Sequence, residues 1–235
     1  MIFVYLIFAI WFYNWLCPKK VRHELNVYFG VPGAGKTTLA AYLTKQANKQ
    51  AWPITLAERY PCWLSTRILA SRFWKRRLPV WSNVPITGAY QLDPPKDIGK
   101  YMIVGGKVII DEAGLEYNNR SFKTFPPEAI YWYKYHRHYE CSVDVFSQSH
   151  EDMDITLRRL AQNYFVVKKS LIPFCVVFRR IRRKIGIDEH THQIVDMYYF
   201  LPFGLGSKWI FSPSLWKLFN SYSRKELPAK AWEMW

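Results

Sequence analysis

The most constraining stretch of the sequence is a glycine-rich segment between a predicted strand and a predicted helix. Residues 30–37 read Gly-Val-Pro-Gly-Ala-Gly-Lys-Thr, which fits the spacing of Gly, four residues, then Gly-Lys-Ser/Thr. The apolar residues 25–29 precede it, and residues 38–45 follow with apolar side chains at three- and four-residue spacing. Strand, loop and helix therefore follow one another in the order that a phosphate-binding loop requires.

Each residue type in this segment suits an anion site. Glycines let the backbone curl so that successive N–H groups converge on phosphate oxygens, and a helix that begins near Gly35 adds its N-terminal dipole. The ammonium of Lys36 is then expected to reach the β- and γ-phosphates of ATP, and the Thr37 hydroxyl to hold Mg²⁺. The predicted nucleotide-binding residues are Gly30, Gly33, Gly35, Lys36, Thr37 and Thr38.

A second motif, Lys-Val-Ile-Ile-Asp-Glu-Ala at residues 107–113, predicts a buried strand that ends in two carboxylates. In open α/β sheets, ligands bind at the carboxyl ends of the strands. We expect Asp111 to order the Mg²⁺ shell and Glu112 to polarise the attacking water. The alternative is a buried strand followed by a capping acid, which the phosphate-loop pattern upstream disfavours. A water-activating Glu112 also argues against a small-molecule kinase.

The other predicted elements supply polar groups to the same region. Gln148 ends a predicted strand at residues 143–149, where it would sense the γ-phosphate; the alternative is an edge amide that binds backbone. Arg158 or Arg159, on a predicted helix at residues 155–161, is expected to act in trans on a neighbouring subunit. The remaining predicted elements are strands at 80–84, 164–167 and 174–178 and a helix at 128–139.

The charge of the chain indicates an anionic partner. The formal net charge is +15, and from Arg158 to Lys184 there are nine basic residues and no acidic one. Such a surplus suits nucleic acid or an anionic membrane, although a generally basic surface is the plainer interpretation. The residues predicted to contact nucleic acid are Arg179, Arg180, Arg182 and Arg183. The four cysteines form no C-x-x-C pair, so no zinc site is predicted.

The first 17 residues contain no charged side chain and predict a short transmembrane anchor. Lys19, Lys20 and Arg22 follow, and by the positive-inside rule they place the rest of the chain in the cytoplasm. A cleaved signal peptide is disfavoured because it would need a basic start and a small-residue cleavage site. An interfacial or intersubunit helix is the remaining alternative. Residues 51–77 predict a basic amphipathic helix.

These observations predict an α/β fold of the P-loop NTPase class, with a mainly parallel central sheet flanked by helices and an N-terminal transmembrane helix. The predicted ATPase domain spans residues 24–200, and residues 201–235 are predicted to form a C-terminal tail.

Five segments together resemble the zonula occludens toxin (Zot) family of phage-encoded P-loop ATPases. The series of Arg-His, Asp and Gln after the Asp-Glu strand is more specific than the phosphate loop, and the resemblance covers about residues 25 to 180. In this chain the predicted membrane span precedes the ATPase domain, whereas in the family it follows. The matching segments are Gly30–Thr38, Val80–Ile86, Val108–Ala113, Tyr135–His138 and Asp144–Gln148.

The resemblance implies a membrane-anchored ATPase of the FtsK/HerA type that forms a homo-oligomeric ring, expected to be hexameric. Such an ATPase would bind ATP and Mg²⁺, phage DNA (expected to be single-stranded) and phage coat or assembly proteins. Its expected location is the host inner membrane, with a single pass and a cytoplasmic ATPase domain. One alternative is a genome-packaging ATPase of a phage with an internal membrane. A nucleotide-binding scaffold that hydrolyses nothing is a further alternative, and a purely structural coat protein is disfavoured.

Overall fold

The computed structural model describes residues 5–9, 23–48, 78–117, 126–187, 194–204 and 206–220. Its strands are β1 (Leu25–Phe29), β2 (Val80–Ser82), β3 (Tyr90–Gln91), β4 (Lys107–Ile110), β5 (Ser142–Ser147), β6 (Asn163–Lys169), β7 (Cys175–Ile187), β8 (Ile194–Phe200) and β9 (Ser207–Phe211). Its labelled helices are α2 (Lys36–Ala47), α5 (Pro94–Asp97), α6 (Ala113–Glu116), α7 (Pro127–Tyr135) and α8 (Ile155–Leu160), with short 3₁₀ turns at Pro202–Gly204 and Trp216–Leu218. Residues 5–9 are also helical.

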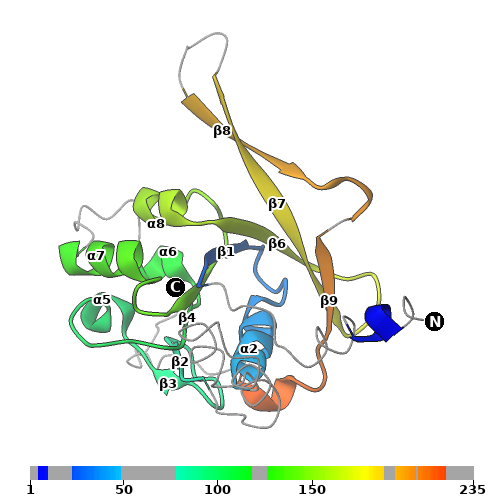
Figure 1. Cartoon of the computed structure of the whole chain (residues 1–235), viewed down its shortest axis with the longest axis horizontal. Helices are drawn as coiled ribbons and strands as arrows, with labels where there is room; N and C mark the ends of the chain where they lie inside the picture. Colours follow the sequence, from blue (N-terminus) through cyan, green and yellow to red (C-terminus); the bar gives the residue numbers. More distant parts are fainter. Residues whose placement is uncertain are drawn as a thin grey trace, which may run out of the picture.

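The described strands form one mixed sheet in the order β3-β2-β4-β5-β1-β6-β7-β8, and β9 pairs with β7 (Figure 1). The pairs from β3 to β6 are parallel, whereas β7 pairs antiparallel with β6, β8 and β9. Strand β5 lies between β1 and β4, so the strand before the glycine-rich loop and the strand before Asp111 are next-but-one neighbours. The predicted α/β fold with a mostly parallel central sheet is confirmed.

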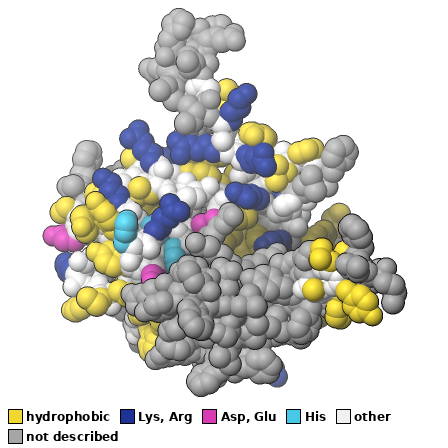
Figure 2. All heavy atoms as spheres, viewed as in Figure 1, with side chains coloured by type: hydrophobic (Ala, Val, Ile, Leu, Met, Phe, Trp, Pro, Cys, Tyr) yellow, Lys and Arg dark blue, Asp and Glu magenta, His cyan; other side chains and the backbone are white. Residues whose placement is uncertain are grey.

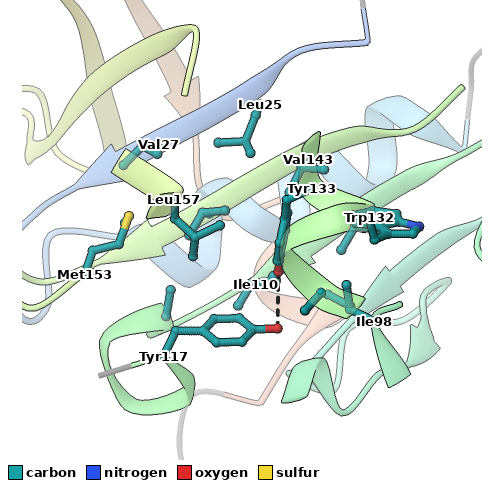
Figure 3. Close-up of a cluster of buried hydrophobic side chains, with 14 of the residues drawn as sticks. Leu25, Val27, Ile98, Ile110, Tyr117, Trp132, Tyr133, Val143, Met153 and Leu157 are labelled. Carbon is teal, nitrogen blue, oxygen red and sulfur yellow. Dashed lines mark hydrogen bonds between the residues drawn. The ribbon is translucent and has the colours of Figure 1, made fainter. Parts of the chain in front are cut away.

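Two hydrophobic clusters cover the two faces of the sheet, which explains why its central strands are apolar at almost every position. Helix α2 packs on one face, where Leu39 contacts a cluster that includes Phe146. Helices α7 and α8 cover the other face, where Tyr133 and Leu157 lie among the aliphatic residues of β1, β4 and β5 (Figure 3). The hydroxyl of the buried Tyr133 donates a hydrogen bond to Tyr117 (3.3 Å), so this polar group is satisfied inside the core.

A row of polar side chains crosses the sheet near the amino ends of its parallel strands. Asp144 is fully buried; it forms an ion pair with Lys107 on β4 and accepts a hydrogen bond from Asn26 on β1 (2.8 Å). The amide of Asn163 on β6 donates to Asn26 (2.9 Å), and Arg180 on β7 donates to Asn163. Because a slip by one residue would leave these buried groups unpaired, the row specifies the register of five adjacent strands.

Strand β7 is longer than the sequence pattern predicts, since it continues through the arginine-rich segment to Ile187. Its pairing with β6 ends at Ile181, and beyond this residue it pairs only with β8. Figure 1 shows that this part of the β7–β8 hairpin projects from the body of the molecule, and we call it the hairpin arm (residues 182–187 and 194–199). The strand predicted at 174–178 was therefore correct in place but too short.

Three further predictions differ from the structure or lie outside it. Helix α7 ends at Tyr135 and not at 139, because residues 136–140 form turns that lead into β5. Strand β9 joins the sheet, so residues 206–220, assigned above to a tail, belong to the folded domain. The predicted helix at 51–77 lies outside the described residues.

The predicted membrane anchor at residues 1–17 also lies outside the described residues, except for residues 5–9. Within the described ranges, no helix has both the length and the apolar character that a bilayer span needs. The anchor therefore stays a prediction.

Candidate nucleotide-binding site

The glycine-rich loop leaves the carboxyl end of β1 and leads into α2, as predicted. The amide of Gly30 donates to the carbonyl of Ser147 on β5 (3.2 Å), which ties the loop to the neighbouring strand. Gly33 and Gly35 have φ angles of 73° and 96°, which residues with a Cβ atom rarely adopt. A Cβ on Gly30 would lie 2.8 Å from the carbonyl oxygen of Val167, so this position also requires glycine.

The ammonium of Lys36 lies inside the curve of this loop. It donates hydrogen bonds to the carbonyls of Gly30 (2.8 Å) and Val31 (3.4 Å), and the residue is 7% exposed. Thr38, on the same first turn of α2, is buried. A lysine ammonium enclosed by a glycine-rich loop, whose backbone N–H groups can reach a ligand, is an arrangement that binds phosphate groups.

Thr37 and Asp111 meet at the carboxyl ends of β1 and β4. The Thr37 hydroxyl donates to the Asp111 carboxylate (2.9 Å), and Asp111 is 4% exposed. Burial raises the pKa of Asp111, while the hydrogen bonds from Thr37 and from the Glu112 amide and the charge of Lys36 act in the opposite direction. A hydroxyl and a carboxylate at this distance are oxygen ligands of the kind that Mg²⁺ takes, so the residues fit the predicted metal.

Glu112 and Gln148 are brought together from neighbouring strands. The side-chain amide of Gln148 donates to the Glu112 carboxylate (2.9 Å). Glu112 has a left-handed backbone (φ 51°, ψ 48°), which is unusual for a residue other than glycine. Such strain is found where a side chain must be aimed at a site, and here it turns Glu112 away from the line of β4. The Gln148 amide thus bonds a side chain and not the backbone, and its role as a γ-phosphate sensor stays a prediction.

Asn83 belongs to the same site, although the sequence analysis assigned it no role. It follows the last residue of β2, and its side chain bonds both main-chain groups of Asp111: it donates to the carbonyl (2.8 Å) and accepts from the N–H (2.8 Å). One feature of the sequence could have identified Asn83 as a site residue. Its amide side chain follows a strand, β2, whose carboxyl end lies at the same edge of the sheet as that of β4. Asn83 therefore holds the main chain of a predicted Mg²⁺ ligand.

The two arginines of α8 differ in their surroundings. Arg158 lies 3.1 Å from Nδ1 of His150, whose other ring nitrogen contacts the Tyr198 hydroxyl (2.9 Å). Arg158 is thus engaged within its own subunit, whereas Arg159 is exposed. Of the two, Arg159 has the side chain that is available to a neighbouring subunit.

The arginines predicted to bind nucleic acid divide between the two faces of β7, because side chains alternate along a strand. Arg179 donates to the Leu201 carbonyl and lies over the Phe200 ring (4.7 Å), while Arg180 is bonded to Asn163. Arg182, on the hairpin arm, is exposed. Figure 2 shows Lys and Arg side chains gathered on the viewed face over this part of the sheet.

A hollow of about 480 Å³ lies beside the glycine-rich loop. Its wall includes Gln148 and two exposed lysines at the end of β6, Lys168 and Lys169. The Lys169 ammonium lies 3.9 Å from the point that a Cβ on Gly33 would occupy. Lys169, one of the nine basic residues between Arg158 and Lys184, therefore adds a second cation beside the loop.

The comparisons agree with this geometry at the level of the fold. No protein-family model matches the sequence, and no curated protein matches it either. Among solved structures, the N-terminal domain of zonular occludens toxin from Neisseria meningitidis superposes with a TM-score of 0.53 and 17% sequence identity, over 85% of this chain and 100% of that one.

Two other solved structures are more distant. The genome packaging NTPase B204 from Sulfolobus turreted icosahedral virus 2, in complex with ATP-gammaS, has a TM-score of 0.36 and 11% identity, over 76% of this chain and 98% of its own. The RadB recombinase has a TM-score of 0.37 and 13% sequence identity, over 82% of this chain and 91% of its own. The resemblance inferred from the sequence is confirmed in the fold: this chain is similar to the N-terminal domain of zonular occludens toxin.

Proposed function

We propose that this protein is an ATPase that hydrolyses ATP at the carboxyl edge of β1, β4 and β5. One observation carries the proposal. The Thr37–Asp111 and Gln148–Glu112 pairs form at this one edge, beside the glycine-rich loop that encloses Lys36. These are the groups that phosphoryl transfer to water needs: a phosphate cradle, a Mg²⁺ site and a base for the attacking water.

Each residue has a separate task in this mechanism. ATP with Mg²⁺, when bound, supplies the phosphoryl group and neutralises part of its charge. Lys36 and the loop amides bind the phosphates, and Thr37 and Asp111 hold the metal. Glu112 receives the proton of the attacking water on the carboxylate oxygen that does not accept from Gln148, and Gln148 keeps that carboxylate oriented.

The experiment that tests ATP hydrolysis compares two variants of the detergent-solubilised full chain. Lys36→Ala removes the phosphate contact and should abolish nucleotide binding, whereas Glu112→Gln should keep binding and lose turnover. A fluorescent ATP analogue measures binding and phosphate release measures turnover. Wild-type turnover in Glu112→Gln would exclude Glu112 as the base. Binding without turnover in the wild-type chain would instead favour the non-hydrolysing scaffold.

We further propose that hydrolysis drives phage or prophage virion assembly, with translocation or extrusion of phage DNA, from the inner membrane of the host. The net charge of +15 and the uncharged residues 1–17 support this role, together with the shared fold. Single-stranded DNA should stimulate turnover, and deletion of residues 1–17 should release the chain from membranes. Stronger stimulation by double-stranded DNA would favour genome packaging inside a phage with an internal membrane.

A homo-oligomeric ring is the arrangement that this proposal requires, and Arg159 is the residue we expect to reach a neighbouring subunit's γ-phosphate. Its exposure on α8 supports this choice over Arg158. Rings that mix an Arg159→Ala chain with a Lys36→Ala chain should recover part of the lost turnover. A site is intact when its loop comes from the Arg159→Ala chain and its arginine from the Lys36→Ala chain. No recovery in rings shown to be mixed would contradict a role in trans.

A further inference from the structure

The turn between β6 and β7 is apolar and exposed, which is the opposite of what a surface turn in water favours. It reads Ser-Leu-Ile-Pro-Phe at residues 170–174. Leu171 is fully exposed (103%), and Ile172 and Phe174 are 55% and 60% exposed. Leu171 belongs to neither hydrophobic cluster of the described residues, so its apolar side chain is open to a contact from outside the chain.

Aromatic side chains of two other segments extend this apolar surface. Phe211 on β9 pairs with Cys175 at the start of β7, and Trp209 pairs with Val177. The Trp216 ring meets the Phe174 ring edge-on, with 6.0 Å between centroids. We call this set the apolar end of the sheet; its exposed members are Leu171, Ile172, Phe174, Trp209, Phe211 and Trp216.

Lysines flank the segments of the apolar end in the sequence, and no acidic residue lies near these segments in the sequence. Lys168 and Lys169 precede the turn, Lys208 precedes Trp209, and Lys217 follows Trp216. The four lysines are exposed. Residues 155–187 and 197–220 contain no Asp or Glu at all. An apolar surface with tryptophans and a border of lysines is complementary to the interface of an anionic bilayer, where tryptophan and lysine lie at the headgroups.

We propose that the apolar end inserts into an anionic membrane surface, as a second contact that is independent of residues 1–17. A protruding turn suits a fluid bilayer, which moulds around it, whereas a protein partner must offer a matching hollow. A second copy of this chain, packed end to end on this surface, is disfavoured because it would bring the same lysines against those of the first. The proposal rests on the proposed membrane location and adds the part of the folded domain that meets the lipid.

The test places a fluorescent label at the tip of the turn in the full-length chain. Cys17, Cys62 and Cys175 are replaced by Ser, while Cys141 is retained because it is buried. An environment-sensitive dye is attached to Leu171→Cys and, as a matched control, to Tyr131→Cys, an exposed aromatic position on α7. The chains are mixed with vesicles of phosphatidylcholine, with or without phosphatidylserine.

The label at 171 should move to shorter emission wavelengths with the anionic vesicles and be quenched by spin-labelled acyl chains, whereas the label at 131 should do neither. Lys208→Gln with Lys217→Gln should reduce the preference for phosphatidylserine. Vesicles that carry the protein while the label at 171 stays in water would overturn the inference and leave anchoring by residues 1–17 intact. A shift of the emission at position 171 in the absence of lipid would also overturn the inference. If that shift grows with protein concentration, a second copy covers the turn; if it does not, another segment of the same chain covers it.

Discussion

Asn83 bonds both main-chain groups of Asp111, so the end of β2 continues the pairing with β4 through a side chain. The two hydrogen bonds are each 2.8 Å long, and they follow directly on the parallel pairing of Ser82 with Ile109. Asp111 also precedes Glu112, whose backbone is left-handed. The amide of Asn83 therefore fixes the point at which β4 stops being a strand and the two carboxylates separate.

We predict that Asn83→Ala lowers ATP turnover by about 10- to 100-fold, the usual effect of removing a group that orients a metal ligand. The concentration of Mg²⁺ needed for half-maximal turnover should rise, because Asp111 is then less well positioned. Turnover measured against Mg²⁺ concentration checks this. The control is Asn48→Ala, which removes another side-chain bond to a carbonyl, that of Gly88, at the opposite end of α2 from the glycine-rich loop. An unchanged Mg²⁺ dependence in Asn83→Ala would contradict the positioning role.

Removal of the Gln148 side chain should slow turnover while nucleotide binding stays intact. Gln148→Ala leaves the Glu112 carboxylate unoriented, and we expect a loss of about 10-fold or more in kcat. Gln148→Glu should be worse, because it places a second carboxylate beside Glu112. Steady-state kinetics and binding of a fluorescent ATP analogue separate the two effects. Gln46→Ala, on the exposed side of α2, is the control; equal losses of binding and turnover in Gln148→Ala would refute an orienting role.

Asp111→Asn should stabilise the fold while it abolishes Mg²⁺-dependent hydrolysis. Burial raises the pKa of Asp111 in the folded chain, so the folded state binds a proton more readily than the unfolded state, and the ionised carboxylate destabilises the protein at neutral pH. Asparagine removes that charge, and a gain of about 1 kcal/mol in the free energy of unfolding is typical of such functional sites.

The gain should shrink as the pH falls through the folded pKa of Asp111 and vanish below the unfolded pKa, where both states carry the proton. Thermal unfolding between neutral and acid pH measures this difference. Glu128→Gln removes an equal charge from an exposed position on α7 and is the control. A melting temperature of Asp111→Asn at or below that of the wild type would count against a raised pKa.

The stability of the fold should fall as the pH decreases below about 6.5, in part because of His136. This residue is buried, its Nδ1 lies 2.6 Å from the Tyr133 carbonyl, and burial lowers its pKa from the usual 6.5. The unfolded chain therefore takes up a proton at a higher pH than the folded chain, and stability is lost from pH 6.5 down through the folded pKa. Denaturant unfolding at several pH values should show a flatter dependence in His136→Gln; an unchanged slope would exclude this residue as a contributor.

The salt dependence of DNA binding should depend more on the basic residues of the hairpin arm than on Arg179 and Arg180, which precede the arm on β7. Single-stranded DNA binding weakens with salt with a log–log slope of about −0.7 for each phosphate contact, so Arg182→Gln with Lys184→Gln should flatten the slope by about 1.4. Arg179→Gln with Arg180→Gln should change it less, because both guanidinium groups are held by contacts within the chain. Fluorescence anisotropy at several salt concentrations measures the slopes. An equal change in both pairs would contradict this division.

The sequence predicts the centre of the sheet well because local and long-range requirements coincide there. The glycine pattern specifies its own backbone. Strand β1 is a mostly apolar run that leads into the glycine-rich loop, and β4 and β5 are mostly apolar runs that lead into Asp111 and Gln148. Their meeting follows from the rule that parallel strands present their carboxyl ends at one edge. The pairing of Gln148 with Glu112 could be expected on that basis, although its donor and acceptor atoms could not.

The remaining features depend on contacts that no local pattern encodes. Asn83 falls within the strand predicted at residues 80–84, whereas β2 ends at Ser82, and only the proximity of β2 and β4 gives the Asn83 side chain its partner. The arginines of β7 read as a solvent-exposed run, but pairing with β8 makes them part of a long strand. Helix α7 stops early because Cys141 and the strand after it must reach the sheet.

Strand β7 begins against the glycine-rich loop and ends in the hairpin arm. Val176 lies under Gly35, where a Cβ on the glycine would come within 2.6 Å of a Val176 methyl group. The whole strand, Cys175–Ile187, has 13 residues and a length of about 43 Å. One continuous strand therefore joins the glycine-rich loop to the hairpin arm. Any tilt of this strand about Val176 would be largest at the far tip of the arm.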